Sequence, residues 1–190
     1  MHSILRLSAC CCLLAGGFNS RSAIAADQPE AKTVIEFADG HLQVKAPPGW
    51  VRKQPLTSIV EHEFALPAVK PDANDGRMTL MAAGGGVEAN IDRWYGQFSQ
   101  PDGGSTRDRA KVKQIKVGGA DVHLVDISGT FKDQRGPAAP AVERPKYRML
   151  GAIIPTKGAG TYFIKVYGPE RTMADNEKAF LAMIESLQQK

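Results

Sequence analysis

The chain has 190 residues, of which 43% are hydrophobic and 23% are charged, and its formal net charge is +4. This length and apolar content suffice for one domain with its own core. Arg6 and Arg21 lie close to the N-terminus, and the chain from residue 26 onward carries a charge of only +2. So small an excess of positive charge argues against a nucleic-acid-binding protein.

Residues 1–25 have the three parts of a cleavable export signal. Arg6 supplies the positive start, Leu7–Phe18 is the apolar core, and Ala23–Ala25 is an A-x-A site with cleavage expected before Ala26. A second small-residue triplet one position later would shift the mature end by one residue. The apolar core is shorter than the ~20 residues that a membrane-spanning helix needs. We therefore expect an exported protein, periplasmic or secreted, with no transmembrane segment after cleavage.

All three cysteines of the chain, Cys10, Cys11 and Cys12, lie within this signal. Leu7–Cys10 also matches the lipobox pattern of bacterial lipoproteins. A lipobox cysteine follows an apolar core, whereas here the apolar core lies after Cys10, so we expect no lipid anchor there. Cleavage before Ala26 leaves a mature chain without disulfides, thiol nucleophiles or cysteine-ligated metals.

After a predicted disordered leader at residues 26–32, residues 33–190 are expected to form one domain. Short apolar runs bounded by turn residues predict strands at residues 33–37, 41–45, near 51, 59–66, 77–83, 111–117, 120–131, 147–154 and 161–167. Asp39-Gly40 and Gly118-Gly119 are dipeptides of the kind that close hairpins. The stretch 132–146 carries three prolines and is expected to be a long exposed loop.

Two helices are predicted from apolar residues at helical spacing. Their buried faces are formed by Val87, Ile91, Trp94 and Phe98 in the first helix and by Met173, Phe180, Ile184 and Leu187 in the second. The breakers in residues 101–104 are expected to end the first helix, and Thr172 is expected to cap the second.

The strand at residues 120–131 is apolar on both faces. Val122 and Leu124 point to one side, whereas Val125 and Ile127 point to the other. A strand buried on both sides lies in a sheet that is covered on both faces. Because hairpin turns dominate, we predict an α+β fold in which a mainly antiparallel sheet has one helix on each face.

This order of elements, with Ala46–Trp50 leading into a strand, resembles the α/β/α sandwich of the photosystem extrinsic protein PsbP and its relatives. The resemblance spans most of residues 33–188. Gly84–Trp94 and Tyr147–Ile154 also resemble segments of a group of uncharacterised secreted bacterial proteins that is common in planctomycetes. The resemblance implies an exported protein with a PsbP-like fold. It favours binding over catalysis, since most proteins of that fold are non-enzymatic accessory or partner-binding proteins.

Gly84, Gly85 and Gly86 open the first predicted helix and form the candidate ligand-binding site. Backbone amides at a helix N-terminus can hold a phosphate, sulfate or carboxylate when no side chain stands in front of them. These glycines are not followed by Lys-Ser or Lys-Thr and belong to no G-x-G-x-x-G motif. A tight connection between strand and helix would explain the same glycines without a ligand.

Three histidines remain after the signal, and none stands in a complete catalytic or metal-binding motif. His41, His62 and His123 would bind a metal only by converging with one another or with acidic residues. On a strand, His62 faces away from the glutamates that flank it, and His123 faces away from Asp126 and Ser128. No G-x-S-x-G elbow accompanies these residues.

A calcium loop is suggested by Asp72–Gly76, but its glycine comes one position early and the twelfth residue is Ala83 instead of glutamate. We therefore expect a turn there.

Taken together, these patterns predict no catalytic residue, metal or cofactor in the chain. The predicted function is a non-catalytic exported binding or accessory module, with an envelope protein as its partner. The alternative is a hydrolase-type enzyme, which requires that two of five side chains meet in one pocket: His41, His62, His123, Asp126 and Glu61.

Overall fold

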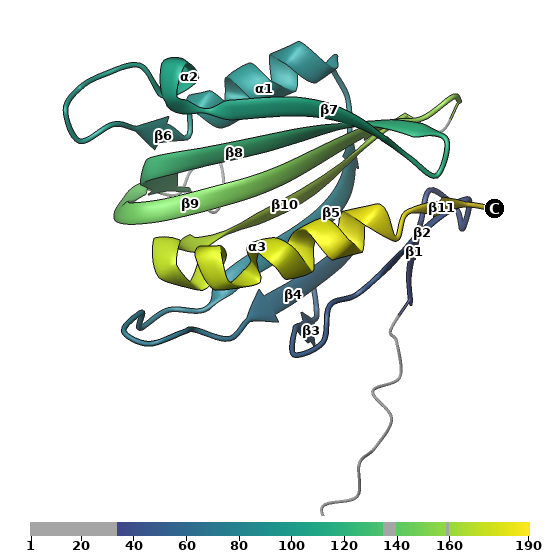
Figure 1. The fold of residues 1–190 in the computed structure, drawn as a ribbon, viewed down its shortest axis with the longest axis horizontal. Helices are drawn as coiled ribbons and strands as arrows, with labels where there is room; N and C mark the ends of the chain where they lie inside the picture. The colour runs from purple at the N-terminus through teal and green to yellow at the C-terminus, as the bar shows by residue number, and fades with distance from the viewer. Residues whose placement is uncertain (1–33, 135–139, 159) are drawn as a thin grey trace, which may run out of the picture.

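The structure is a computed structural model that describes residues 34–134, 140–158 and 160–190 (Figure 1). The predicted export signal, its cysteines and the leader lie outside these residues. The elements in chain order are β1 Val34–Phe37, β2 Leu42–Lys45, β3 Val51–Lys53, β4 His62–Leu66, β5 Gly76–Ala83, α1 Val87–Tyr95, β6 Phe98–Ser99, α2 Thr106–Arg109, β7 Lys111–Val117, β8 Ala120–Asp133, β9 Val142–Pro155, β10 Thr161–Pro169, α3 Glu170–Glu185 and β11 Gln188–Gln189. Among the helices of the described residues, none is long and apolar enough to cross a membrane.

The strands of the described residues form two sheets. The larger sheet has the order β3-β4-β5-β10-β9-β8, with β6 and β7 both paired to β8, and the smaller sheet has the order β1-β2-β11. Every strand pairing is antiparallel. The structure therefore confirms the prediction of a mainly antiparallel sheet.

Alternating side chains of the large sheet enter two separate core clusters. On β9, Leu150 belongs to the first cluster and Met149 to the second, and on β8 Val122 belongs to the first and Val125 to the second. Buried residues of α3 complete the first cluster, and buried residues of α1 complete the second. The two-faced pattern predicted for the strand at 120–131 is confirmed. Figure 1 shows α3 crossing in front of the sheet.

A glycine on β9 allows α1 to pack closely on the sheet. A Cβ atom at Gly151 would lie 2.3 Å from Cζ3 of Trp94, so the indole occupies the space where another side chain would stand. The same indole packs edge-on against Phe163 of β10, with 6.1 Å between the ring centroids. The helix position therefore depends on the absence of a side chain at this one residue.

The first predicted helix is too long. In the structure α1 ends at Tyr95, with Gly96 as its C-cap. Phe98 lies in β6 opposite Phe131. Phe98 is still buried in the same cluster as the helix residues. Helical spacing predicted that it is buried but assigned it to the wrong element, because glycine has a low helix propensity and the chain turns at Gly96.

The second predicted helix has a different cap from the expected one. α3 begins at Glu170 after the N-cap Pro169, and Thr172 is buried in its first turn. One carboxylate oxygen of Asp72 accepts hydrogen bonds from the backbone N–H and the hydroxyl of Thr172, both at 2.7 Å. The backbone amide of Thr172, which has no partner within α3, therefore donates to a residue in the loop between β4 and β5. Leu187 is buried as predicted, but it lies beyond the end of α3.

Strand boundaries also differ from the predictions. β4 begins only at His62, and Ile59 is 67% exposed. Both ends of the predicted 132–146 loop are strand, because β8 and β9 remain paired as far as Asp133 and Val142. Where the register shifts, two residues of β9 including Pro145 lie opposite one residue of β8, and such a bulge accommodates a proline.

Candidate functional site

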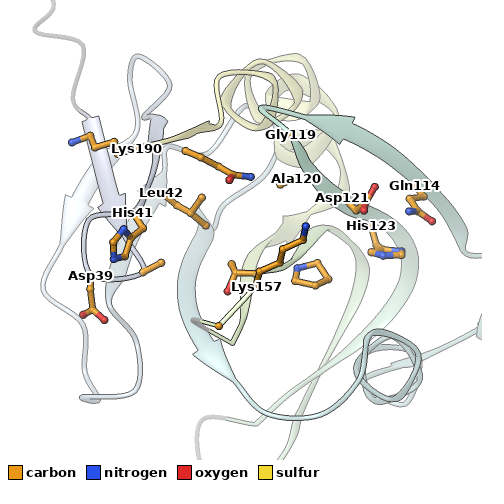
Figure 2. Close-up of a pocket in the computed structure, with 15 residues that line it drawn as sticks. Asp39, His41, Leu42, Gln114, Gly119, Ala120, Asp121, His123, Lys157 and Lys190 are labelled. Atoms are coloured by element: carbon orange, nitrogen blue, oxygen red, sulfur yellow. The ribbon is translucent and has the colours of Figure 1, made fainter.

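The described residues surround a pocket of about 820 Å³ at the end of the sheets where several turns meet (Figure 2). Its walls come from the β1–β2 turn, the β7–β8 hairpin, the β9–β10 turn and β11. These segments are far apart in the sequence, and the antiparallel register of the strands brings them to one end of the molecule (Figure 1). Loops carried by a rigid sheet are a common setting for binding sites.

Backbone contacts hold the pocket walls in place. The amide of His41 donates to the carbonyl of Ala38 at 2.9 Å, which closes the β1–β2 turn, and the amide of Lys190 donates to the carbonyl of His41 at 2.9 Å. Gly118 has a φ of +56°, and a Cβ atom there would lie 2.4 Å from the carbonyl oxygen of Leu187. The predicted glycine turn therefore also lets the β7–β8 hairpin contact the segment that follows α3.

Two of the charged side chains that line the pocket are already paired. Lys190 forms an ion pair with Glu36, and Asp121 forms one with Lys116 at 3.1 Å. The hydrogen bond from Lys116 holds the pKa of the Asp121 carboxyl below its ordinary value. Lys157 is exposed and points into the pocket in Figure 2, and within the described part of the chain it forms no ion pair. It is therefore the cation best placed to meet a ligand.

His41 and His123 stand on opposite walls of this pocket, with Lys157 between them in Figure 2. Two of the five side chains named for the hydrolase alternative thus line one pocket, but no hydrogen bond joins them among the described residues, so they do not form an acid–base pair. Neither Asp126 nor Glu61 is among the residues that line it. Among the described residues, no group of three or more His, Cys, Asp or Glu side chains could hold a metal ion.

His62 makes structural contacts away from the pocket. Its Nδ1 lies 2.9 Å from a guanidinium nitrogen of Arg52, and its Nε2 lies 2.8 Å from the carbonyl oxygen of Glu36. Arginine can only donate, so Nδ1 accepts and Nε2 donates. The ring ties β4 to β1. The neighbouring Glu63 binds Arg77 instead, as expected for side chains on opposite faces of a strand.

Asp126 belongs to an ion-pair network on the face covered by α3. Its two carboxylate oxygens accept from Arg148 at 2.8 and 2.9 Å, and the same guanidinium donates to Glu177 of α3 at 2.8 Å. These hydrogen bonds raise the pKa of Arg148 above its ordinary value. The network joins β8, β9 and α3, so a structural role accounts for Asp126. His123 lies elsewhere, and the predicted separation of these two residues is confirmed.

The Gly84–Gly86 segment forms the tight connection from β5 to α1. Gly85 has a φ of +95°, and Gly86 is the N-cap of α1. The buried side-chain amide of Asn90 donates to the carbonyl oxygens of Gly84 and Gly86, at 3.2 and 2.9 Å. The sequence reasoning missed Asn90, although it lies one helical turn after Gly86. Anion binding at this turn stays a prediction.

Four polar residues of the pocket were not predicted from the sequence as site residues, and they come from different parts of the chain. Gln114, Asp121, Lys157 and Lys190 form no local motif, and only the strand register brings them together. The available signal was the set of predicted hairpin turns, because alternate turns of an antiparallel sheet lie at the same end.

The sequence matches no protein-family model and no curated protein. Among solved structures, the chain is similar to the solution structure of cyanobacterial PsbP (CyanoP) from Synechocystis sp. PCC 6803, with a TM-score of 0.47, 8% identity, and coverage of 83% of this chain and 92% of that one. It is also similar to a Pseudomonas aeruginosa protein of unknown function, with a TM-score of 0.45, 13% identity, and coverage of 83% of this chain and 96% of that one.

Proposed function

We propose that this chain is an exported, non-catalytic binding module and that the pocket in Figure 2 binds a small polar molecule with an anionic group. The observation that carries the proposal is Lys157, whose ammonium group points into the pocket and forms no ion pair within the described residues. An anionic group of the ligand would give this lysine the partner that the described residues do not provide.

The rest of the lining suits the polar part of such a ligand. His41, His123 and Gln114 can donate or accept hydrogen bonds, and Leu42 supplies an apolar contact. The volume of about 820 Å³ lies within the range of small-molecule sites, roughly 300–1,000 Å³. Asp39 also lines the pocket, so a cationic group on the same ligand would find a partner there.

The proposal is tested by recording amide NMR spectra of the ¹⁵N-labelled protein during separate titrations with inorganic phosphate and citrate. A titration with sodium chloride at equal ionic strength is the control. We expect saturable shifts at His41, His123 and Lys157 with phosphate or citrate, and only small, non-saturating changes with chloride. Shifts confined to the Gly84–Gly86 turn would place anion binding there and overturn the pocket proposal. No saturable shift with either anion would also overturn it.

Export is the second part of the proposal. It rests on the charged start, apolar core and A-x-A site of residues 1–25. Expression of the full chain in a Gram-negative host, followed by fractionation and intact-mass measurement, should give a periplasmic protein that begins at Ala26 or one residue beyond. A protein that keeps residues 1–25 and stays in the cytoplasm would contradict export. A mature protein that begins at Cys10 with added lipid mass would support the lipobox instead.

We also propose that the domain is a PsbP-like α/β/α sandwich that serves an envelope protein. The sandwich is supported by the two core clusters, since α1 and α3 contribute to different ones. An experimental structure with both helices on one face of the large sheet would contradict this arrangement. The proposal of an envelope partner is supported only by the predicted export. It is tested by in-cell cross-linking of the wild-type chain and of a Lys157→Gln chain. We expect the wild-type chain to form a cross-link that the variant loses.

A further inference from the structure

A lysine lies in the middle of the large sheet, on the face covered by α1. Lys165 is on β10, and its neighbours across the sheet are Thr79 of β5 and Gly151 of β9. It shares a face with Phe163 and Tyr167, which belong to or pack against the second core cluster. Such a position normally holds an apolar residue, because burying a charged amine is costly unless it is paired.

The contacts of the Lys165 amine suit a neutral group better than a cation. Nζ lies 5.1 Å from the ring centroid of Phe131 and 5.0 Å from that of Tyr167. Its hydrogen-bond partner is the side-chain oxygen of Gln97, which is an uncharged acceptor. The two rings offer a cation some attraction, but an amide oxygen provides no countercharge.

The charged groups around Lys165 come from several strands. Arg77 on β5 carries a positive charge and is bound to Glu63 on β4 and to the hydroxyl of Tyr167. The nearby acid, Asp133 on β8, is paired with Arg144 on β9 at 3.3 Å. Both nearby charges therefore have partners other than the lysine. Tyr147 of β9 packs against the same cluster.

Burial lowers the pKa of Lys165 to about 7, the charge of Arg77 acts in the same direction, and Asp133 opposes both. At pH 7 the Lys165 amine is then neutral in about half of the molecules. An ordinary lysine, with a pKa of ~10.4, is almost entirely protonated at this pH. Lys165 is also partly exposed. At neutral pH this partly exposed residue therefore carries an amine with a free electron pair in about half of the molecules.

We propose that Lys165 is a nucleophilic amine that captures small carbonyl compounds, such as aliphatic aldehydes, as imines. The lone pair of Nζ attacks the carbonyl carbon to form a C–N bond, and a proton moves from nitrogen to oxygen to give a carbinolamine. Protonation of the hydroxyl and loss of water then form the C=N bond, and the nitrogen releases its remaining proton. The sum is amine plus aldehyde giving imine plus water, with no change of oxidation state.

The aromatic surroundings define the ligand class further. The rings of Phe131 and Tyr167 have their centroids 5.1 and 5.0 Å from the amine nitrogen, so we expect an aldehyde with an alkyl or aryl group to be preferred over a charged one. Lys165 does not line the pocket of Figure 2. An experiment that disproves one of these two proposed sites therefore leaves the proposal for the other unaffected.

The test is reductive trapping on the wild-type protein, which needs no variant. The protein is incubated with limiting butyraldehyde at pH 7, reduced with borohydride and mapped by peptide mass spectrometry. Lys113 and Lys157, both exposed, are internal controls. The neutral fraction of Lys165 exceeds that of an ordinary lysine about 10³-fold at pH 7. A less basic amine is a weaker nucleophile, so the expected rate advantage is about 30-fold.

Two outcomes decide the proposal. Labelling of Lys165 should reach half its maximum near pH 7, whereas labelling of Lys113 should still rise at pH 9. In a Lys165→Met chain the intact-mass adduct formed at pH 7 should disappear, while a Lys157→Met chain should keep it. Labelling of Lys165 at the rate of Lys113 or slower, at every pH, would overturn the proposal. Preference for glyoxylate over butyraldehyde would overturn the apolar ligand class.

Discussion

Replacing Lys165 by methionine should remove a specific pH dependence of folding stability. The pKa of Lys165 is about 7 in the folded protein and 10.5 in the unfolded chain. Between these values the unfolded chain binds more protons than the folded protein, so the free energy of unfolding rises with pH. Below pH 7 the destabilisation by the buried amine is complete, and it is lost as the pH rises toward 10.5. Methionine has a similar length, no charge and no titration in this range.

The size of the effect follows from proton linkage. A group that is neutral when folded and charged when unfolded changes the free energy of unfolding by about 1.36 kcal/mol per pH unit. At pH 7 Lys165 is only half neutral in the folded state, which reduces the slope at the start of the window. From pH 7 to pH 9 the wild-type protein should therefore gain about 2 kcal/mol relative to the Lys165→Met variant.

Urea unfolding at pH 7, 8 and 9 measures this difference. Tryptophan fluorescence is a suitable probe, because Trp50 belongs to the first core cluster and Trp94 to the second. A Lys113→Met chain, altered on the exposed face of β7, is the matched control and should track the wild type at every pH. A difference between wild type and Lys165→Met that stays constant from pH 7 to pH 9 would refute the assignment of a lowered pKa to this lysine.

Two further substitutions test how the helices are held. Gly151→Ala places a Cβ atom against the ring of Trp94 and should lower the free energy of unfolding by about 1–3 kcal/mol, whereas Gly84→Ala, with nothing within 4 Å of its Cβ, should change it by less than about 0.5 kcal/mol. Equal urea midpoints for the two variants would contradict the close packing of α1 on β9. Asp72→Ala removes the cap on Thr172 and should cost about 1 kcal/mol, measured in the same assay. An unchanged midpoint would show that the loop does not support α3.

Most strands of the fold could be predicted because their information is local. Alternating apolar residues and the Gly118-Gly119 turn gave β7 and β8 their correct pairing, since two glycines with positive φ close a hairpin whatever surrounds it. Helical spacing found α1 and α3 for the same reason. The error at Thr172 arose because a tertiary contact from Asp72 decides how α3 is capped. The error at Phe98 arose because α1 already ends before Gly96, and pairing with Phe131 then places Phe98 in β6.

The pocket and the buried amine could not be predicted, because both depend on long-range register. Lys157 lies in an ordinary polar turn, and only the folded chain places it between His41 and His123. Lys165 lies two residues from both Phe163 and Tyr167 along its strand, which indicates that the three side chains share a face but not that the lysine is buried. Its burial follows from the rings and the Gln97 side chain that distant segments bring against it.

The affinity of the pocket for a simple anion tests the central claim most directly. Dissociation constants for inorganic phosphate, measured by NMR titration at fixed ionic strength, should be compared among the wild type, Lys157→Gln and Lys113→Gln. An exposed ion pair contributes up to about 1 kcal/mol, so Lys157→Gln should weaken binding by roughly threefold to fivefold. Lys113→Gln should leave it unchanged. Equal affinities in all three proteins would contradict the claim that Lys157 and its pocket form the binding site.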